Sequence, residues 1–74
     1  MPLLNPLPYR TVKRKLEAAG FVEVSQKGSH VKFVKYTNSG TLTAIVPRHK
    51  EIAPGTLRSI LRQAGLSVEA FEEL

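Results

Sequence analysis

The chain has 74 residues, no cysteine and a formal net charge of +5, from 11 basic and 6 acidic residues. This length predicts a single domain over residues 1–74, with an open functional surface rather than a deep enclosed cavity. The lack of cysteine excludes disulfides, thiolate nucleophiles and cysteine-based zinc sites. The basic excess favours a polyanionic partner, most commonly nucleic acid, although surplus basic residues also serve solubility.

The N-terminal segment is rich in proline, and we expect residues 1–7 to be loosely ordered. It lacks the basic start and the unbroken apolar run of a signal peptide. No run in the chain approaches the roughly 18 apolar residues that span a membrane. We therefore expect a cytoplasmic protein that does not associate with a membrane.

A first helix is predicted from Pro8 to Ala19, because apolar residues recur there at helical spacing. Gly20 is expected to follow the helix in the left-handed conformation, with Phe21 folding back onto the last turn. The members of the apolar stripe are Tyr9, Val12, Leu16 and Ala19.

Three strands follow, predicted over residues 21–26, 30–37 and 41–46, with turns at Lys27-Gly28 and at residues 38–40. In the second strand Val31 and Phe33 point to one face, and the alternating positions 30, 32, 34 and 36 point to the other. The second set mixes apolar and polar residues, so the pattern leaves open which face is buried.

A second helix is predicted from Pro54 to Ala64, with Gly65 after its end and Ser67 capping a last short helix. The order predicts an α+β fold in which a three-stranded antiparallel sheet carries its helices on one face. The other face of the sheet is then open to solvent or to a partner.

The tripeptide Gly28-Ser29-His30 lies where the first two strands meet. Glycine allows the backbone to turn tightly, serine can donate to a phosphate oxygen, and histidine exchanges protons near neutral pH. A neutral imidazole at position 30 can take the proton from a ribose 2′-hydroxyl, as a general base. A surface histidine after a turn is the commoner reading of such a tripeptide taken alone.

Basic residues near this turn are candidates for contacts with RNA phosphates and for stabilising charge during cleavage. The alternative is that each of them is only a solvent-exposed residue, either in a strand or in the segment that connects the third strand to the second helix. The residues in question are Lys27, Lys32, Arg48, His49 and Lys50. The general acid is left open among Lys27, Lys32 and His49.

Four segments together resemble the HicA, or YcfA-like, toxin family. They read Leu-Glu-x-x-Gly-Phe at 16–21, Gly-Ser-His at 28–30, Val-Pro-x-His at 46–49, and Gly-Thr-Leu-Arg-Ser-Ile-Leu-x-Gln-Ala-Gly-Leu at 55–66. The resemblance runs from about Tyr9 to the end of the chain, and it is the combination and order of the segments that make it specific. The segment before Tyr9 has no clear counterpart.

The resemblance implies a fold like that of double-stranded-RNA-binding domains, α-β-β-β-α. It also implies a metal-independent mRNA interferase, an endoribonuclease of a toxin-antitoxin system in the stress response, without a cofactor. The catalytic histidine of the Gly-Ser-His motif corresponds to His30. The implied partners are mRNA and a HicB-like antitoxin that covers the face carrying His30.

Two other functions fit the same residues. A non-catalytic RNA-binding module could use the same basic sheet face, with salt-sensitive binding and no strand scission. A protein-interaction domain could use that face for an acidic partner. The sequence alone fits the ribonuclease and both of these alternatives.

Overall fold

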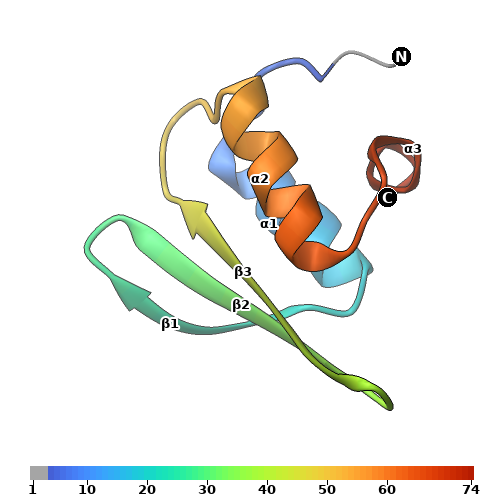
Figure 1. Ribbon diagram of the computed structural model, residues 1–74. Helices are drawn as coiled ribbons and strands as arrows, with labels where there is room; N and C mark the ends of the chain where they lie inside the picture. The colour runs from blue at the N-terminus through green and yellow to red at the C-terminus, as the bar shows by residue number, and fades with distance from the viewer. Residues whose placement is uncertain (1–3) are drawn as a thin grey trace.

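The computed structural model describes residues 4–74 and shows the predicted order of helices and strands (Figure 1). Helix α1 precedes three strands, and helices α2 and α3 follow them. The bounds are α1 Tyr9–Ala18, β1 Val22–Lys27, β2 His30–Thr37, β3 Gly40–Pro47, α2 Pro54–Ala64 and α3 Val68–Glu72. The protein thus has an α+β fold consistent with that of double-stranded-RNA-binding domains.

The three strands form one antiparallel sheet in the order β1-β2-β3. Helices α1 and α2 cover one face of this sheet, while the other face carries no helix (Figure 1). A bulge between Glu23 and Ser25 interrupts the pairing of β1 with β2. The backbone N–H of Ile45 in β3 donates to the side-chain oxygen of Gln63 at 2.8 Å, so α2 is also fixed to the outer edge of the sheet.

The core lies between the helices and the inner face of the sheet. Val31 and Phe33 are fully buried there, which settles the orientation that the sequence pattern left open. Val34, on the opposite face, is also buried, with an exposed fraction of 5%. It lies in the central strand between Val22 and Thr43, so its neighbours in the sheet shield it.

Both long helices end as the sequence predicts, with a glycine at positive φ. The N–H of Phe21 donates to the carbonyl of Leu16 at 2.9 Å, and Phe21 is buried. Because this bond holds Phe21 to α1, β1 begins one residue later than predicted, at Val22. Pro8, predicted inside the first helix, is instead the extended N-cap residue, and α1 begins at Tyr9.

The N-terminal segment is the main departure from the sequence prediction. Residues 1–3 lie outside the described residues. Leu4, however, is buried, with an exposed fraction of 8%, and Leu7 forms a β-bridge with Ile52. Residues 4–7 are therefore packed rather than loosely ordered, because their two leucines extend the apolar core.

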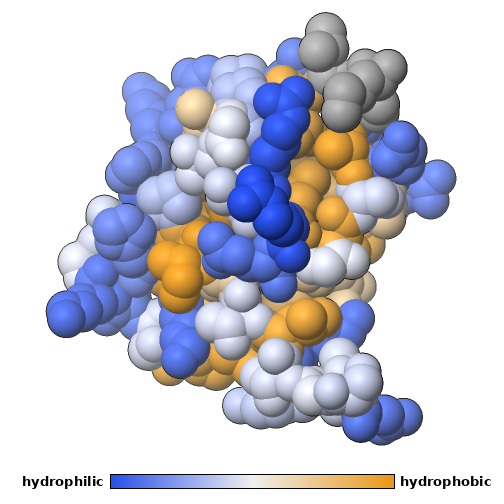
Figure 2. All heavy atoms as spheres, viewed as in Figure 1, coloured by the Kyte–Doolittle hydropathy of each residue, from blue (hydrophilic) through white to orange (hydrophobic). Residues whose placement is uncertain are grey.

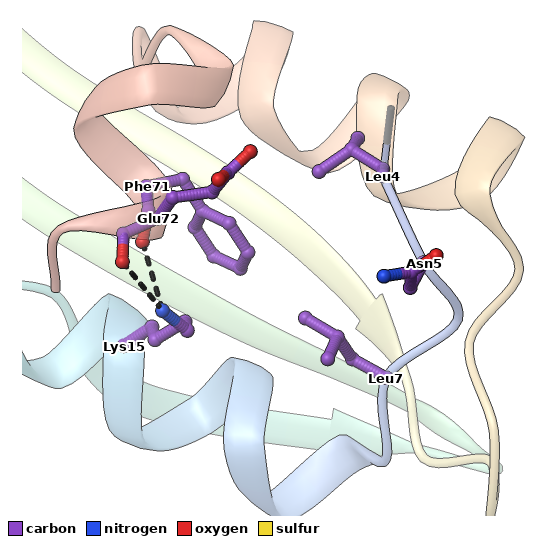
Figure 3. Close-up of a pocket in the computed structure, with 6 residues that line it drawn as sticks. All are labelled: Leu4, Asn5, Leu7, Lys15, Phe71 and Glu72. Atoms are coloured by element: carbon purple, nitrogen blue, oxygen red, sulfur yellow. Dashed lines mark hydrogen bonds between the residues drawn. The ribbon is translucent and has the colours of Figure 1, made fainter. Parts of the chain in front are cut away.

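Side chains of this segment line a hollow of about 230 Å³ against α1 and α3 (Figure 3). The ammonium of Lys15 donates there to the carbonyls of Phe71 at 3.0 Å and Leu74 at 3.1 Å. It also lies 5.1 Å from the centre of the Phe71 ring. The lysine thus fixes the C-terminal segment to α1.

Within residues 4–74, no helix has the length and apolar composition needed to cross a membrane.

Candidate functional site

The turn between β1 and β2 is held by the chain on both sides of it. Gly28 has a φ of +59°, a conformation that L side chains rarely adopt, which accounts for the glycine of the Gly-Ser-His tripeptide. The side-chain amide of Gln26 donates to the carbonyl of Gly28 at 2.9 Å. The carbonyl of Ser29 accepts a bond from the backbone N–H of Arg48 at 2.5 Å. The turn is therefore tied to the connection that follows β3.

His30 begins β2 on the helix-free face of the sheet, hereafter the open face. Its cross-strand neighbours are Lys27 in β1 and Pro47 in β3, and its side chain is exposed. Within residues 4–74, no other side chain forms a hydrogen bond with its imidazole. An exposed imidazole with unused nitrogen atoms can take up or release a proton at a bound substrate.

Lys32 lies two residues further along β2 and therefore on the same open face as His30. Its neighbours across the sheet are Ser25 and Ile45. Among the open-face positions of the three strands there is no carboxylate, since Glu23, the only acidic residue in the strands, pairs with Phe33 on the helix side. An anion that approaches His30 thus meets two lysines and no acidic residue of the sheet.

The open face also exposes apolar side chains. Tyr36, Val22 and Ile45 keep 73%, 51% and 39% of their surfaces accessible. Exposed apolar groups on a face rimmed by charge are typical of a surface that meets a partner.

Arg48 does not share this face. Its guanidinium donates to the side-chain oxygen of Gln26 at 3.0 Å and lies 5.3 Å from the centre of the Tyr9 ring. Gln26 is the cross-strand neighbour of Val31, whose side chain is in the core, so Gln26 is on the helix side of the sheet. Arg48 therefore turns away from His30 towards α1, although the sequence led us to expect both residues at the same RNA phosphate.

His49 and Lys50 also lie by α1. The carbonyl of His49 accepts from the backbone N–H of Tyr9 at 3.3 Å, which places this connection at the start of α1. Both residues are exposed and line an open hollow there. Of the three general-acid candidates, Lys27 and Lys32 share the face of His30, while His49 belongs to this hollow.

An ion pair joins α1 to β1 at the same edge of the molecule. Lys13 of α1 contacts Glu23 of β1 at 2.9 Å. The hydrogen bond from Lys13 lowers the pKa of the Glu23 carboxyl, and the same bond raises the pKa of Lys13. Burial, with the nearby Glu23 charge, raises the pKa of the Tyr9 hydroxyl. These side chains hold α1 against the outer edge of β1.

The sequence pattern missed the part that Tyr9 plays here. Its helical spacing placed it on the apolar stripe of the first helix, and its ring does pack near Phe33, with the ring centres 6.4 Å apart. Its contact with Arg48 joins residues 39 positions apart in the chain. No local sequence pattern predicts such a contact, because it forms only when α1 and the segment after β3 pack together.

The distribution of polar surface agrees with this arrangement. Hydrophilic atoms predominate on the left of the space-filling view, over the β1–β2 turn and the connection from β3 to α2 (Figure 2). Within residues 4–74, no three histidine, aspartate or glutamate side chains gather as metal ligands would.

Fold and site together define a small basic α+β domain, similar in fold to double-stranded-RNA-binding domains, with an exposed histidine between lysines on a bare sheet face. Comparison with protein families matches residues 9–66 to the family described as "HicA toxin of bacterial toxin-antitoxin". The match covers most of the chain, and the protein belongs to the HicA toxin family. It is therefore the toxin type of a toxin-antitoxin pair, which implies an antitoxin partner. A search of curated proteins found no matching relative.

Proposed function

We propose that this toxin is an endoribonuclease that cleaves mRNA without a metal ion, with His30 as its catalytic residue. The observation that carries the proposal is the exposed His30 imidazole on a carboxylate-free open face, next to a hydrogen-bonded turn and with Lys27 and Lys32 on the same face. Membership of the HicA toxin family supports it further.

The proposed reaction uses a nucleophile that the RNA supplies. Neutral His30 takes the proton from a ribose 2′-hydroxyl, and the resulting oxygen attacks the adjacent phosphorus. The bond from phosphorus to the 5′-oxygen breaks, leaving a 2′,3′-cyclic phosphate and a 5′-hydroxyl that has gained a proton. Because the nucleophile and the leaving group both belong to the RNA, the chemistry needs no metal ion.

Lys27 and Lys32 stabilise the charge that develops on the non-bridging phosphate oxygens. They are also the favoured sources of the proton for the leaving 5′-oxygen, since they share the open face with His30. Gly28 and Ser29 bring backbone and hydroxyl donors to the same phosphate. Arg48, His49 and Lys50 contribute binding to the RNA rather than chemistry.

The open face also serves a HicB-like antitoxin in this proposal. Its exposed apolar side chains, Tyr36, Val22 and Ile45, give such a protein a surface to bury, and the bound protein would cover His30. Since mRNA and its translation are cytoplasmic, the toxin acts in the cytoplasm.

The chemistry can be tested with two matched substrates, an RNA and the same sequence with 2′-O-methyl groups. The proposal predicts cleavage of the RNA only, with cyclic phosphate ends on the products. Cleavage of the methylated strand would contradict it, because no 2′-hydroxyl is present there. Binding of RNA without any cleavage would instead favour the non-catalytic RNA-binding module.

A further inference from the structure

An open hollow of about 260 Å³ lies at the beginning of α1, on the helix side of the sheet. This volume is below the roughly 300 Å³ at which pockets for small molecules usually begin, and it suits a phosphate group better than a metabolite. We name it the Arg48 hollow. Its lining residues are Pro8, Tyr9, Arg10, Arg48, His49 and Lys50.

The residues that line the Arg48 hollow are cationic and include no carboxylate, and the nearby Glu23 carboxylate, beside Tyr9, is paired with Lys13. Arg10, Arg48 and Lys50 all line it. The only salt bridge among residues 4–74 joins Lys13 to Glu23, so none of these three cations is paired with an acidic residue of the described chain. The first turn of α1 has no acidic residue either, and the positive end of the helix adds to the attraction for an anion.

Arg48 is held in place before any ligand arrives. Its side chain lies between the Tyr9 ring and Gln26, and its backbone is bonded to Ser29. The bond to Gln26 occupies a single donor of the guanidinium, which has five N–H groups. A fixed arginine with donors to spare loses little freedom when it binds a phosphate.

The Arg48 hollow and His30 lie on opposite sides of the same hairpin end. Gln26 marks the helix side beside the hollow, and His30 faces the open side. The bond from Arg48 to Ser29 joins the two sides through the backbone. Because the two sites lie on opposite faces of the sheet, a strand of RNA that contacts both has to pass around the β1–β2 turn.

We propose that the Arg48 hollow is a second phosphate-binding subsite, which holds a backbone phosphate of the RNA a few nucleotides away from the phosphate attacked at His30. This inference rests on the proposed function for the choice of RNA as the polyanion. Its consequence is that the substrate strand wraps around the hairpin end rather than lying flat on the open face.

Binding to a 2′-O-methyl RNA tests the subsite, because this strand binds but offers no hydroxyl for cleavage. The variant is Arg10→Gln with Lys50→Gln, two exposed side chains of the hollow. The matched control is Arg58→Gln with Arg62→Gln, which removes the same charge from exposed positions of α2. Arg48 is left intact, since its contacts also support the fold.

We expect the hollow variant to bind the strand about tenfold more weakly than the control variant. Its slope of log affinity against log salt should also be shallower, by about 0.7 for each phosphate that the variant no longer neutralises. Circular dichroism checks that all proteins are folded. Equal affinities and slopes in the two double variants would overturn the subsite, as would a wild type that does not bind the strand.

This experiment separates the subsite from the ribonuclease. If the wild type binds the strand through the hollow but never cleaves RNA, the proposed activity fails and the subsite stands. If the wild type cleaves RNA and the two double variants bind equally, the subsite fails alone.

Discussion

His30 and Lys32 are alternate residues of β2, and this spacing is what places both on the open face. Lys35, in the same strand, lies on the other face, where its side-chain carbons approach Gly20. Lys32 and Lys35 therefore belong to one strand but lie on its opposite faces.

Replacing Lys32 tests whether the open face takes part in the chemistry. Lys32→Gln removes a cation beside His30 and should lower the single-turnover rate constant of cleavage by about a hundredfold, the loss typical when a single charge-stabilising donor is removed. Lys35→Gln is the control, and we expect it to retain activity close to that of the wild type. Single-turnover cleavage of a labelled RNA measures both, and equal losses would count against a specific role for Lys32.

The ion pair of Lys13 with Glu23 predicts a pH dependence of stability. Because the folded state holds the pKa of the Glu23 carboxyl below its unfolded value, the contribution is fully present above that unfolded value. It is lost as the pH falls through the folded pKa. The melting temperature of the wild type should thus fall more steeply than that of Glu23→Gln between about pH 5 and about pH 3. Parallel curves would show that the pair adds no stability.

Sequence patterns could predict where His30 lies in the sheet, but not which face Arg48 would occupy. The Gly-Ser-His tripeptide and strand alternation are local, and they predicted the turn, the histidine and the lysine beside it. Arg48 was grouped with His30 because it follows the strand that ends next to the turn. Its side chain instead crosses to Tyr9 and Gln26, a choice made by packing between distant segments.

One glycine lies in the first turn of helix α2 and another follows its last residue, and the two differ in conformation. Gly65 has a φ of +70° at the helix end, and Leu66 donates from there to the carbonyl of Leu61 at 2.9 Å. Gly55 lies in the first turn of the helix, and a Cβ there would meet no atom within 4 Å.

Replacement of each glycine by alanine should therefore have opposite effects. Gly65→Ala is expected to lower the free energy of unfolding by about 1 kcal/mol, because alanine is strained in the left-handed conformation. Gly55→Ala is expected to raise the free energy of unfolding by about 0.4 to 1 kcal/mol, because alanine lowers the conformational entropy of the unfolded chain. Urea denaturation measures both, and a stabilised Gly65→Ala variant would contradict the assigned conformation.

Helix and strand periodicity predicted the first five elements, and the Ser67 cap predicted the last short helix, since these are local features of the sequence. The N-terminal segment was predicted poorly, because its prolines suggested disorder and its leucines have no period. Leu7 pairs with Ile52, far along the chain, and Leu4 is buried in the core that distant segments complete. Only the assembled core shows that they have a place to pack.

The whole molecule has a small core, and its stability depends on a few large side chains. Phe33 is fully buried on the inner face of β2. Phe33→Ala should cost about 3 to 5 kcal/mol, against a total of roughly 4 to 11 kcal/mol expected for a chain of 74 residues. We therefore expect this variant to be largely unfolded or to melt far below the wild type by circular dichroism. A near-normal melting temperature would contradict the packing described.

The fold places the two proposed sites on opposite sides of one hairpin end. The open face carries His30 and its lysines, and the helix side carries the Arg48 hollow. A chain this short has no room for a deep cleft, so a polymer that passes over both sides suits it better than an enclosed substrate.

The most direct test of the account is cleavage of a long single-stranded RNA in excess EDTA by the wild type and by His30→Ala. His30 is exposed, so its replacement should leave the fold intact, which circular dichroism checks. If His30 is the catalytic residue, the wild type cleaves the RNA and the variant does not. Equal cleavage by a folded His30→Ala variant, or none by a folded wild type, would contradict it.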